Sequence, residues 1–331
     1  MTLLAVLPDP SSPLDHATAK TAFEDILDGR PSDEAVAGFL TGLSERDETG
    51  IEIAAAAQAL RERMIEVRAP VGSIDVCGTG GDGAHSLNIS TAVAIVVAAC
   101  GVPVAKHGNR AASSKAGAAD TLEALGLDLD RASLLAEESL AELGIAFLFA
   151  QKHHPFLAKL AGIRRTLGRR TIFNLIGPLA NPARVTRQLL GIARVDYLST
   201  VALALDLIGT DGAMLVSGEE SLDELSIAGA SRAVLLGTCG DGQIRIVPED
   251  AGLSRHPLTA LHGGDAAHNA AALTALLGGA PGAYRDAVLL NSAAALIVAG
   301  RTTSWPEAAA MAAEAIDDGT AGRLLDRWIA L

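Results

Sequence analysis

Apolar residues recur at helical spacing through the first part of the chain. Residues 18–29, 32–43 and 49–64 each carry apolar side chains three or four positions apart, without strand-like alternation. Ser32 is a favourable N-cap residue for the second of these segments. The pattern predicts three amphipathic helices, followed by a boundary at RAPVGS, residues 68–73.

The periodicity then changes, and short apolar runs begin to alternate with helical segments. SIDVCG (73–78) and VPVAKHG (102–108) have the composition of strands, and the segment between them at 90–100 is apolar on every side. Because a helix that is apolar all round has to be buried, these segments predict a β-α-β unit. We expect Ser90 to cap its helix and Gly101 to end it.

The alternation continues to residue 247. Six further elements are predicted, two helices and then four strands, at 116–125, 131–143, 145–150, 213–218, 233–237 and 241–247. The last strand has the pattern of an antiparallel edge strand, and from Asp265 onward the chain is helical and rich in alanine. This order predicts an α/β fold, with a small all-helical domain and a larger domain whose central, mixed but mostly parallel sheet is flanked by helices.

Composition and charge narrow the function. Of 331 residues, 49% are hydrophobic and only 3% aromatic, so the core must consist mainly of aliphatic side chains. The formal net charge of −13 argues against sequence-independent binding to nucleic acid or to an anionic membrane. The longest apolar run, 91–105, is too short to span a bilayer, and the N-terminus lacks the basic region of a signal peptide. With three cysteines at no metal-like spacing, we expect a cytoplasmic protein with free thiols.

A glycine-rich loop follows the first predicted strand. Gly78, Gly80 and Gly83 match the G-x-G-x-x-G pattern of dinucleotide-binding folds. In those folds the helix starts within the loop, and an acidic residue ends the second strand about 20 residues later. Here the helix is delayed to Ser90, and the second strand ends near the basic Lys106. Both differences argue against a nicotinamide cofactor.

The same loop suits a different anion. Glycine amides and a helix N-terminus both attract phosphate, and KHGNR at 106–110 adds basic side chains. Asp82 fits this site if it meets a sugar hydroxyl or a metal ion. Asp223 and Glu224 follow a predicted strand, where adjacent carboxylates suit Mg²⁺. The simpler alternatives are a tight turn at the glycines and an acid-rich first turn of a helix at the two carboxylates.

Seven stretches resemble the anthranilate phosphoribosyltransferase family in content and order: GTGGDG, NIST, KHGNRAASSKAGAADTLEALG, FLFAQKHHP, RRTLGRRTIFNLIGPLANP, LDELS and GGDAAHNAAAL. The family joins the ribose carbon of phosphoribosyl pyrophosphate (PRPP) to the amine of anthranilate and releases pyrophosphate, with Mg²⁺ as cofactor. The resemblance implies a homodimer. It also implies a helical domain at 1–70 with a helical insertion near 155–182, and an α/β domain made of 71–154 and 183–331.

The resemblance further implies roles for individual residues. PRPP would contact the glycine loop, the helix start and the run after the second strand: Gly78, Gly81, Asp82, Ser86, Asn88, Ile89, Ser90, Thr91, Lys106, His107, Gly108, Asn109, Arg110, Ala111, Ala112, Ser113 and Ser114. Anthranilate would contact Gly78, Asn109, Arg164, His107 and His154. Magnesium would bind Ser90, Asp223 and Glu224. No residue is implied as a strong base, and Lys106, Asn109 and Arg164 would position the substrates.

The chain departs from the family at Ala116 and Ala118, where serines are frequent, which puts its affinity for PRPP in question. Two alternative functions share the fold. A related nucleoside phosphorylase has no need of the paired Asp223 and Glu224 or of the Arg164 run. A non-catalytic relative that binds nucleic acid is expected to be basic and to lack the glycine loop, whereas this chain is acidic and has GTGGDG.

Overall fold

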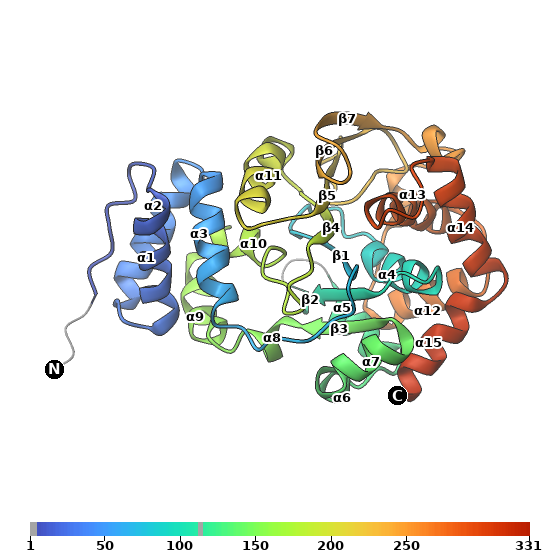
Figure 1. The fold of residues 1–331 in the computed structure, drawn as a ribbon, viewed down its shortest axis with the longest axis horizontal. Helices are drawn as coiled ribbons and strands as arrows, with labels where there is room; N and C mark the ends of the chain where they lie inside the picture. The colour runs from blue at the N-terminus through green and yellow to red at the C-terminus, as the bar shows by residue number, and fades with distance from the viewer. Residues whose placement is uncertain (1–4, 112–114) are drawn as a thin grey trace.

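The computed structural model describes residues 5–111 and 115–331, with a helical bundle at one end and an α/β body at the other (Figure 1). The three N-terminal helices lie where the periodicity predicts them: α1 (His16–Asp28), α2 (Asp33–Glu45) and α3 (Gly50–Arg61). The Ser32 hydroxyl caps α2 by accepting a hydrogen bond from the Ala35 amide. Their apolar side chains share one core with those of α9 (Leu157–Leu167) and α10 (Ile172–Ile176).

One seven-stranded sheet crosses the α/β body, in the order β3-β2-β1-β4-β5-β6-β7. Its strands are β1 (Ile74–Gly78), β2 (Val104–Gly108), β3 (Ile145–Phe149), β4 (Arg187–Gly191), β5 (Gly212–Gly218), β6 (Ser231–Gly237) and β7 (Gly242–Ile246). The first five run parallel, whereas β6 and β7 are antiparallel and β7 forms an edge. The predicted mixed, mostly parallel sheet and its antiparallel edge strand are therefore confirmed.

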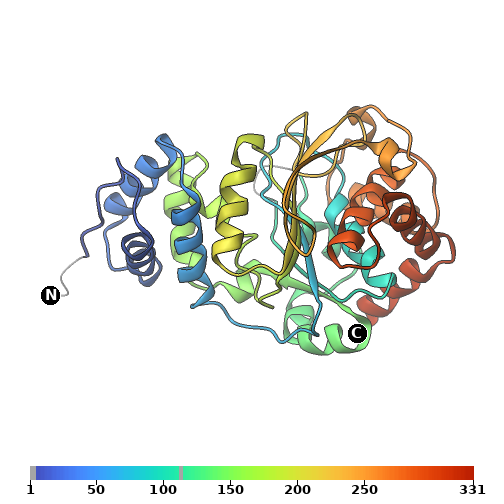
Figure 2. The ribbon, with the colours of Figure 1, turned by 45° about the horizontal axis from the view of Figure 1, so that its top comes forward.

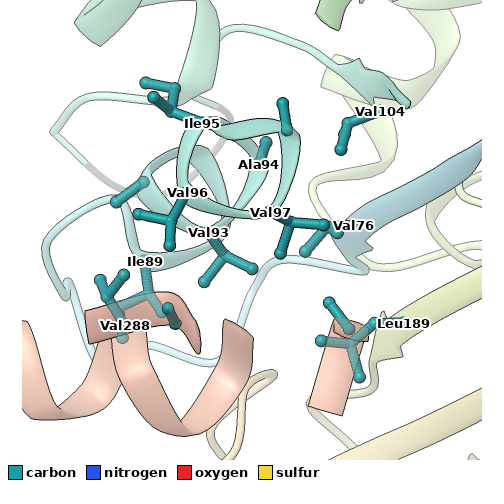
Figure 3. Close-up of a cluster of buried hydrophobic side chains, with 14 of the residues drawn as sticks. Val76, Ile89, Val93, Ala94, Ile95, Val96, Val97, Val104, Leu189 and Val288 are labelled. Carbon is teal, nitrogen blue, oxygen red and sulfur yellow. The ribbon is translucent and has the colours of Figure 1, made fainter. Parts of the chain in front are cut away.

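Helices cover both faces of this sheet (Figure 2). The face toward the helical bundle carries α11 (Leu198–Leu207), and the other face carries α4 (Ile89–Ala99), α12 (Ala266–Leu277), α13 (Ala283–Val298), α14 (Trp305–Asp317) and α15 (Thr320–Ala330). Helix α4 is buried in the middle of the larger core, where Ile89 lies beside Val288 of α13 and Val97 beside Val76 of β1 (Figure 3). The prediction that this all-apolar helix is buried is confirmed.

Three details differ from the expectations. Strand β4 is not predicted, because only Leu189 and Leu190 are strongly apolar among its residues. The helix expected at 131–143 is two helices, α6 (Leu129–Leu134) and α7 (Ala136–Leu143), because the backbone of Leu135 leaves the helical region. A short helix that was not predicted, α8 (Ala150–His153), follows β3, whereas α5 (Ala118–Ala124) lies within the segment predicted at 116–125. No helix in the described parts of the chain is long and apolar enough to cross a membrane.

Ser90 is not the cap of α4, so that expectation is wrong. The helix begins at Ile89, and Asn88 precedes it without a capping hydrogen bond from its side chain. Ser90 therefore lies in the first turn. The other end is as expected, since Gly101 follows the helix with a positive φ of 80°.

The order of the strands identifies where a ligand can bind. From β1 the chain builds outward through β2 to β3, and then returns to β4 on the other side of β1. In open α/β sheets, ligands bind beyond the carboxyl ends of the strands at the point where the winding changes direction. The glycine loop follows β1 at this point, so the topology alone directs attention to it.

Candidate active site

Two glycines at the ends of adjacent strands make room for Asp223. Gly78 of β1 and Gly191 of β4 are register partners. A Cβ on Gly78 would lie 2.9 Å from the Asp223 carboxyl carbon, and a Cβ on Gly191 would lie 2.5 Å from its carbonyl carbon. Asp223 can therefore lie directly over the strand ends because neither glycine has a side chain. Gly191 borders the candidate site and is absent from the sequence analysis, since β4 itself was not predicted.

Asp223 and Glu224 are held by backbone amides of two other segments. The Gly80 amide donates to Asp223 Oδ2 at 2.6 Å, and the Ser90 amide donates to Glu224 Oε1 at 3.2 Å. Residues 219–230, between β5 and β6, contain no helix. The alternative that these carboxylates form an acid-rich first turn is therefore wrong.

The surroundings of the two carboxylates disfavour their charged forms. Burial raises the pKa of Asp223 to about 7, and the negative charge of Asp82 contributes to that rise. Burial and the charge of Asp223 raise the pKa of Glu224 well above its usual range, and the positive charge of Lys106 opposes that shift. Three neighbouring carboxylates of this kind are stable in the ionised state only with a nearby cation.

The donor set fits magnesium better than a metal that needs a full cage of protein ligands. Within residues 5–111 and 115–331, no group of three or more His, Cys, Asp or Glu side chains is arranged to hold a metal ion by itself. Mg²⁺ commonly takes one or two carboxylates from the protein and completes its shell with substrate phosphates and water. Asp223 and Glu224 can supply such carboxylates.

Lys106 is buried beneath the start of α4, with only 2% of its surface exposed. Its ammonium donates to the Val76 carbonyl at 2.7 Å and to Ser90 Oγ at 3.1 Å. An ammonium has three N–H donors, so one remains for a ligand. Since Ser90 Oγ accepts from Lys106, its own hydroxyl proton is free to turn toward a ligand.

Asn88 fixes the start of α4 rather than capping it. Its side-chain oxygen accepts from Thr121 Oγ1 at 2.5 Å and from Asn269 Nδ2 at 2.9 Å, and its amide donates to the Ala116 carbonyl at 3.3 Å. The Tyr284 hydroxyl donates to the Asn88 carbonyl at 3.1 Å. Asn269 and Tyr284 are missed by the sequence analysis, although Asn269 stands as a lone amide in the alanine-rich stretch GGDAAHNAAAL.

A second buried asparagine positions the carboxylate pair. Asn291 of α13 is fully buried, and its Oδ1 accepts from the Leu225 amide at 2.9 Å. Its Nδ2 donates to the Leu225 carbonyl at 3.1 Å and to the Ala287 carbonyl at 2.9 Å. Both backbone groups of the residue after Glu224 are therefore fixed by one side chain. Sequence offers only a weak signal for this role, a single amide within an apolar helix.

The run after β2 is only partly available to a ligand. Arg110 forms ion pairs with Asp120 and Glu123 of α5, so its guanidinium is already paired within the protein. Asn109 Oδ1 accepts from the Arg110 amide at 2.8 Å, and the Ala111 amide donates to Asp120 at 3.0 Å. Ala112, Ser113 and Ser114 lie outside the described residues.

A pair of buried histidines lies beyond the end of β2. The ring centroids of His107 and His154 are 5.1 Å apart. No hydrogen bond of normal geometry reaches His107 Nε2 or either ring nitrogen of His154 from the described residues. Burial lowers the pKa of His107 well below its usual value and that of His154 to about 4. Both rings are therefore neutral at pH 7 and present aromatic surface.

The structure brings part of the predicted set together. Hydrogen bonds or close approach join the glycine loop, the start of α4 and the segment after β5: Gly78, Asp82, Ser90, Lys106, Asp223 and Glu224. Ile89 and Thr91 are buried within α4, and Ser86 forms an isolated bridge with His262. The side chain of Arg164, half-buried on α9, makes no hydrogen bond or ion pair with any described residue, and burial lowers its pKa.

Comparison with known proteins decides the family. The chain matches a glycosyl transferase family in both parts, its helical bundle domain over residues 10–64 and its a/b domain over residues 71–322. It is 61% identical, over 330 residues and 99% of both chains, to an anthranilate phosphoribosyltransferase from Novosphingobium aromaticivorans. The chain belongs to the anthranilate phosphoribosyltransferase family.

Solved structures agree with this membership. An anthranilate phosphoribosyltransferase from Thermus thermophilus has a TM-score of 0.92 and 43% identity, over 97% of this chain and 96% of that one. The Saccharomyces cerevisiae enzyme in complex with PRPP and Mg has a TM-score of 0.88 and 28% identity, over 96% of this chain and 93% of that one. Membership in the anthranilate phosphoribosyltransferase family does not favour the nucleoside phosphorylase or the nucleic-acid-binding relative.

Proposed function

We propose that this protein transfers the 5-phosphoribosyl group of PRPP to the amine of anthranilate and releases pyrophosphate, as a step of tryptophan biosynthesis. The observation that carries the proposal is the position of Asp223 and Glu224 against the glycine loop and the start of α4, in a member of this family. That arrangement combines amide donors, an ammonium and two carboxylates around one space, which suits a diphosphate that arrives with a divalent ion.

The leaving diphosphate sets the demands on the site. Cleavage of the bond at the anomeric carbon leaves an oxocarbenium-like ribosyl group, while negative charge grows on the diphosphate. Lys106 offers its remaining N–H and Ser90 its hydroxyl where this charge develops. Asp223, Glu224 and Ser90 would hold Mg²⁺, which supplies positive charge to the diphosphate when bound.

The acceptor needs positioning more than a base. The amine of anthranilate is neutral and already nucleophilic, so correct placement contributes most of the rate. Arg164 on α9 would bind the anthranilate carboxylate in a two-pronged contact, which suits an arginine that has no partner among the described residues. The neutral His107 and His154 rings would flank the aromatic acceptor, and Asn109 would contact it from the end of β2.

We extend the proposal to organisation. The helical domain comprises residues 1–70 and an insertion near 155–182, and the α/β domain comprises 71–154 and 183–331. The helices α9 and α10 share a hydrophobic core with α1, α2 and α3, which is why the insertion is grouped with them, although that core continues onto α11 and one face of the sheet. We also propose that the protein is cytoplasmic and that it forms a homodimer. Sedimentation equilibrium of the purified protein tests the homodimer directly. A monomer at micromolar concentration would contradict the dimer.

The function is tested by following anthranilate fluorescence with PRPP and Mg²⁺ present together or omitted in turn. We expect loss of fluorescence only when both are present. Asp223→Asn combined with Glu224→Gln should abolish most of the Mg²⁺-dependent turnover while leaving the circular dichroism spectrum unchanged. Turnover without Mg²⁺, or full activity of the double variant, would contradict the proposed site. No consumption of anthranilate by the wild-type protein would contradict the function itself.

A further inference from the structure

Arg170 connects the helical bundle to the glycine loop. It lies between α9 and α10, and its carbonyl accepts a hydrogen bond from Ser44 Oγ of α2 at 3.1 Å. Its side chain extends the other way, toward the α/β body. A Cβ on Gly81 would lie 3.8 Å from Arg170 Nη1 and 3.9 Å from its Cζ. A cation anchored in the helical bundle therefore reaches the loop that follows β1.

The guanidinium of Arg170 has no partner in the described part of the chain, neither a carboxylate nor a hydrogen-bond acceptor. Among the described residues, Arg170 shares this with Arg164, whereas three other nearby arginines form ion pairs with carboxylates: Arg110 with Asp120 and Glu123, Arg169 with Glu45, and Arg194 with Asp47 and Asp196. A half-buried arginine holds five N–H donors in a planar fork, and leaving them without an acceptor is unfavourable. An anion beside the loop would satisfy them.

The loop itself presents donors to the same place. Among the described residues, no hydrogen bond uses the amides of Gly81, Asp82 or Gly83, and both glycines are exposed with positive φ of 75° and 74°. Amides of this kind, turned outward by left-handed glycines, bind phosphate oxygens. The guanidinium fork of an arginine matches the oxygens of a phosphate group as well as it matches a carboxylate.

We propose that Arg170 binds the diphosphate of PRPP across the glycine loop, opposite the side held by Lys106 and the carboxylate pair. This inference rests on the proposed function. It assigns diphosphate binding to Arg170, whereas the family resemblance gives a role to Arg164 alone among the arginines of 164–170, and that role is binding the anthranilate carboxylate. The two arginines then bind different substrates. Arg164 binds the carboxylate of anthranilate, and Arg170 binds the diphosphate that leaves PRPP.

The division has a structural consequence. Because Arg170 is fixed to α2 through its carbonyl, its contact with a diphosphate joins the helical bundle to the α/β body through the bound substrate. The alternative is that Arg170 only fills space beside a small cavity of about 30 Å³ that Glu48 and Tyr197 also line. In that case its loss would affect stability and not the affinity for phosphate.

The test compares Arg170→Ala and Arg170→Lys with Arg169→Ala. Arg169 is a matched control, since it is the adjacent arginine and its ion pair with Glu45 is exposed. We expect Arg170→Ala to raise the KM for PRPP about tenfold or more, because a charge-assisted contact is lost, and to leave the KM for anthranilate within about twofold. The KM of Arg170→Lys for PRPP should lie between the values of the wild type and Arg170→Ala. Both KM values of Arg169→Ala should match those of the wild type.

A second measurement does not depend on turnover. Calorimetric titration with pyrophosphate in the presence of Mg²⁺ should show a similar loss of affinity for Arg170→Ala. Unchanged pyrophosphate affinity and unchanged KM for PRPP in a folded variant would overturn the inference, as would equal rises in both KM values. If Arg170→Ala does not fold, Arg170→Gln serves in its place. Wild-type protein that binds pyrophosphate but consumes no anthranilate would refute the proposed function, while the titration would still decide the role of Arg170.

Discussion

A single methyl group at Gly191 should disable the metal-binding side of the site. Gly191 has no positive φ, so alanine suits its backbone and only the space above it is at issue. The new Cβ would lie 1.6 Å from the carbonyl oxygen of Asp223 and 2.5 Å from its carbonyl carbon. Carbon atoms in contact prefer a separation of about 3.5–4.0 Å, and the contact with the oxygen is shorter still, so the Asp223 backbone has to move by about 1.5 Å or more.

A shift of that size matters more for catalysis than for folding. Overpacking of this kind costs about 1–3 kcal/mol of stability, which a chain with so large a core tolerates. Misplacement of a functional group by about 1 Å can lower the rate about 100-fold. We therefore expect Gly191→Ala to remain folded, to lose about two orders of magnitude in kcat, and to require more Mg²⁺ for half-maximal rate.

The assay is steady-state anthranilate consumption over a series of Mg²⁺ concentrations, with thermal unfolding measured in parallel. Gly38→Ala is the matched control, because its Cβ on α2 would meet no atom within 4 Å. It should gain up to about 1 kcal/mol of stability and keep its activity. If Gly191→Ala showed the wild-type kcat and Mg²⁺ dependence, the argument that Asp223 depends on the two glycines would be refuted.

Three further predictions concern other parts of the site. Asn291→Leu should lower the free energy of unfolding in urea by about 2 kcal/mol or more, because it leaves the buried amide and carbonyl of Leu225 unpaired. It should also raise the Mg²⁺ concentration needed for half-maximal rate, and an unchanged urea midpoint would contradict this prediction. Arg164→Ala should raise the KM for anthranilate far more than that for PRPP; equal rises would place the acceptor elsewhere. Burial lowers the pKa of His154 to about 4, so the unfolded chain binds its proton first and stability falls as pH drops from about 6.5 toward 4. His154→Phe should lose that part of the pH dependence, measured as urea midpoints at pH 5 and 7.5, and an unchanged slope would contradict the assignment.

The fold was largely predictable, because its strongest signals are local. The N-terminal helices, the buried α4 and the edge strand β7 follow from periodicity and from turn residues that act within a few positions. Strand β4 carries no such signal, since its two central leucines are too few for a pattern. Its place beside β1 is fixed by backbone pairing of residues 187–191 with residues 74–78, which are far apart in sequence.

The site was predictable only as a set of segments. Motif resemblance identified the glycine loop and the Asp223–Glu224 pair, and the structure places them in contact. It could not identify Gly191 or Asn291, whose roles exist only because distant strands and helices meet. Nor could it show that Ser90 lies in the first turn of α4, because the residue before a helix and the first residues within it have similar compositions.

In the proposed site, one diphosphate is bound from two sides: by a divalent ion that Asp223 and Glu224 hold, and by the amides of the glycine loop. A crystal soaked with PRPP and Mn²⁺, measured at the manganese absorption edge, tests this directly. We expect an anomalous peak beside these two carboxylates, with the diphosphate between them and residues 78–91. Diphosphate bound with its metal at any other place on the protein would contradict it.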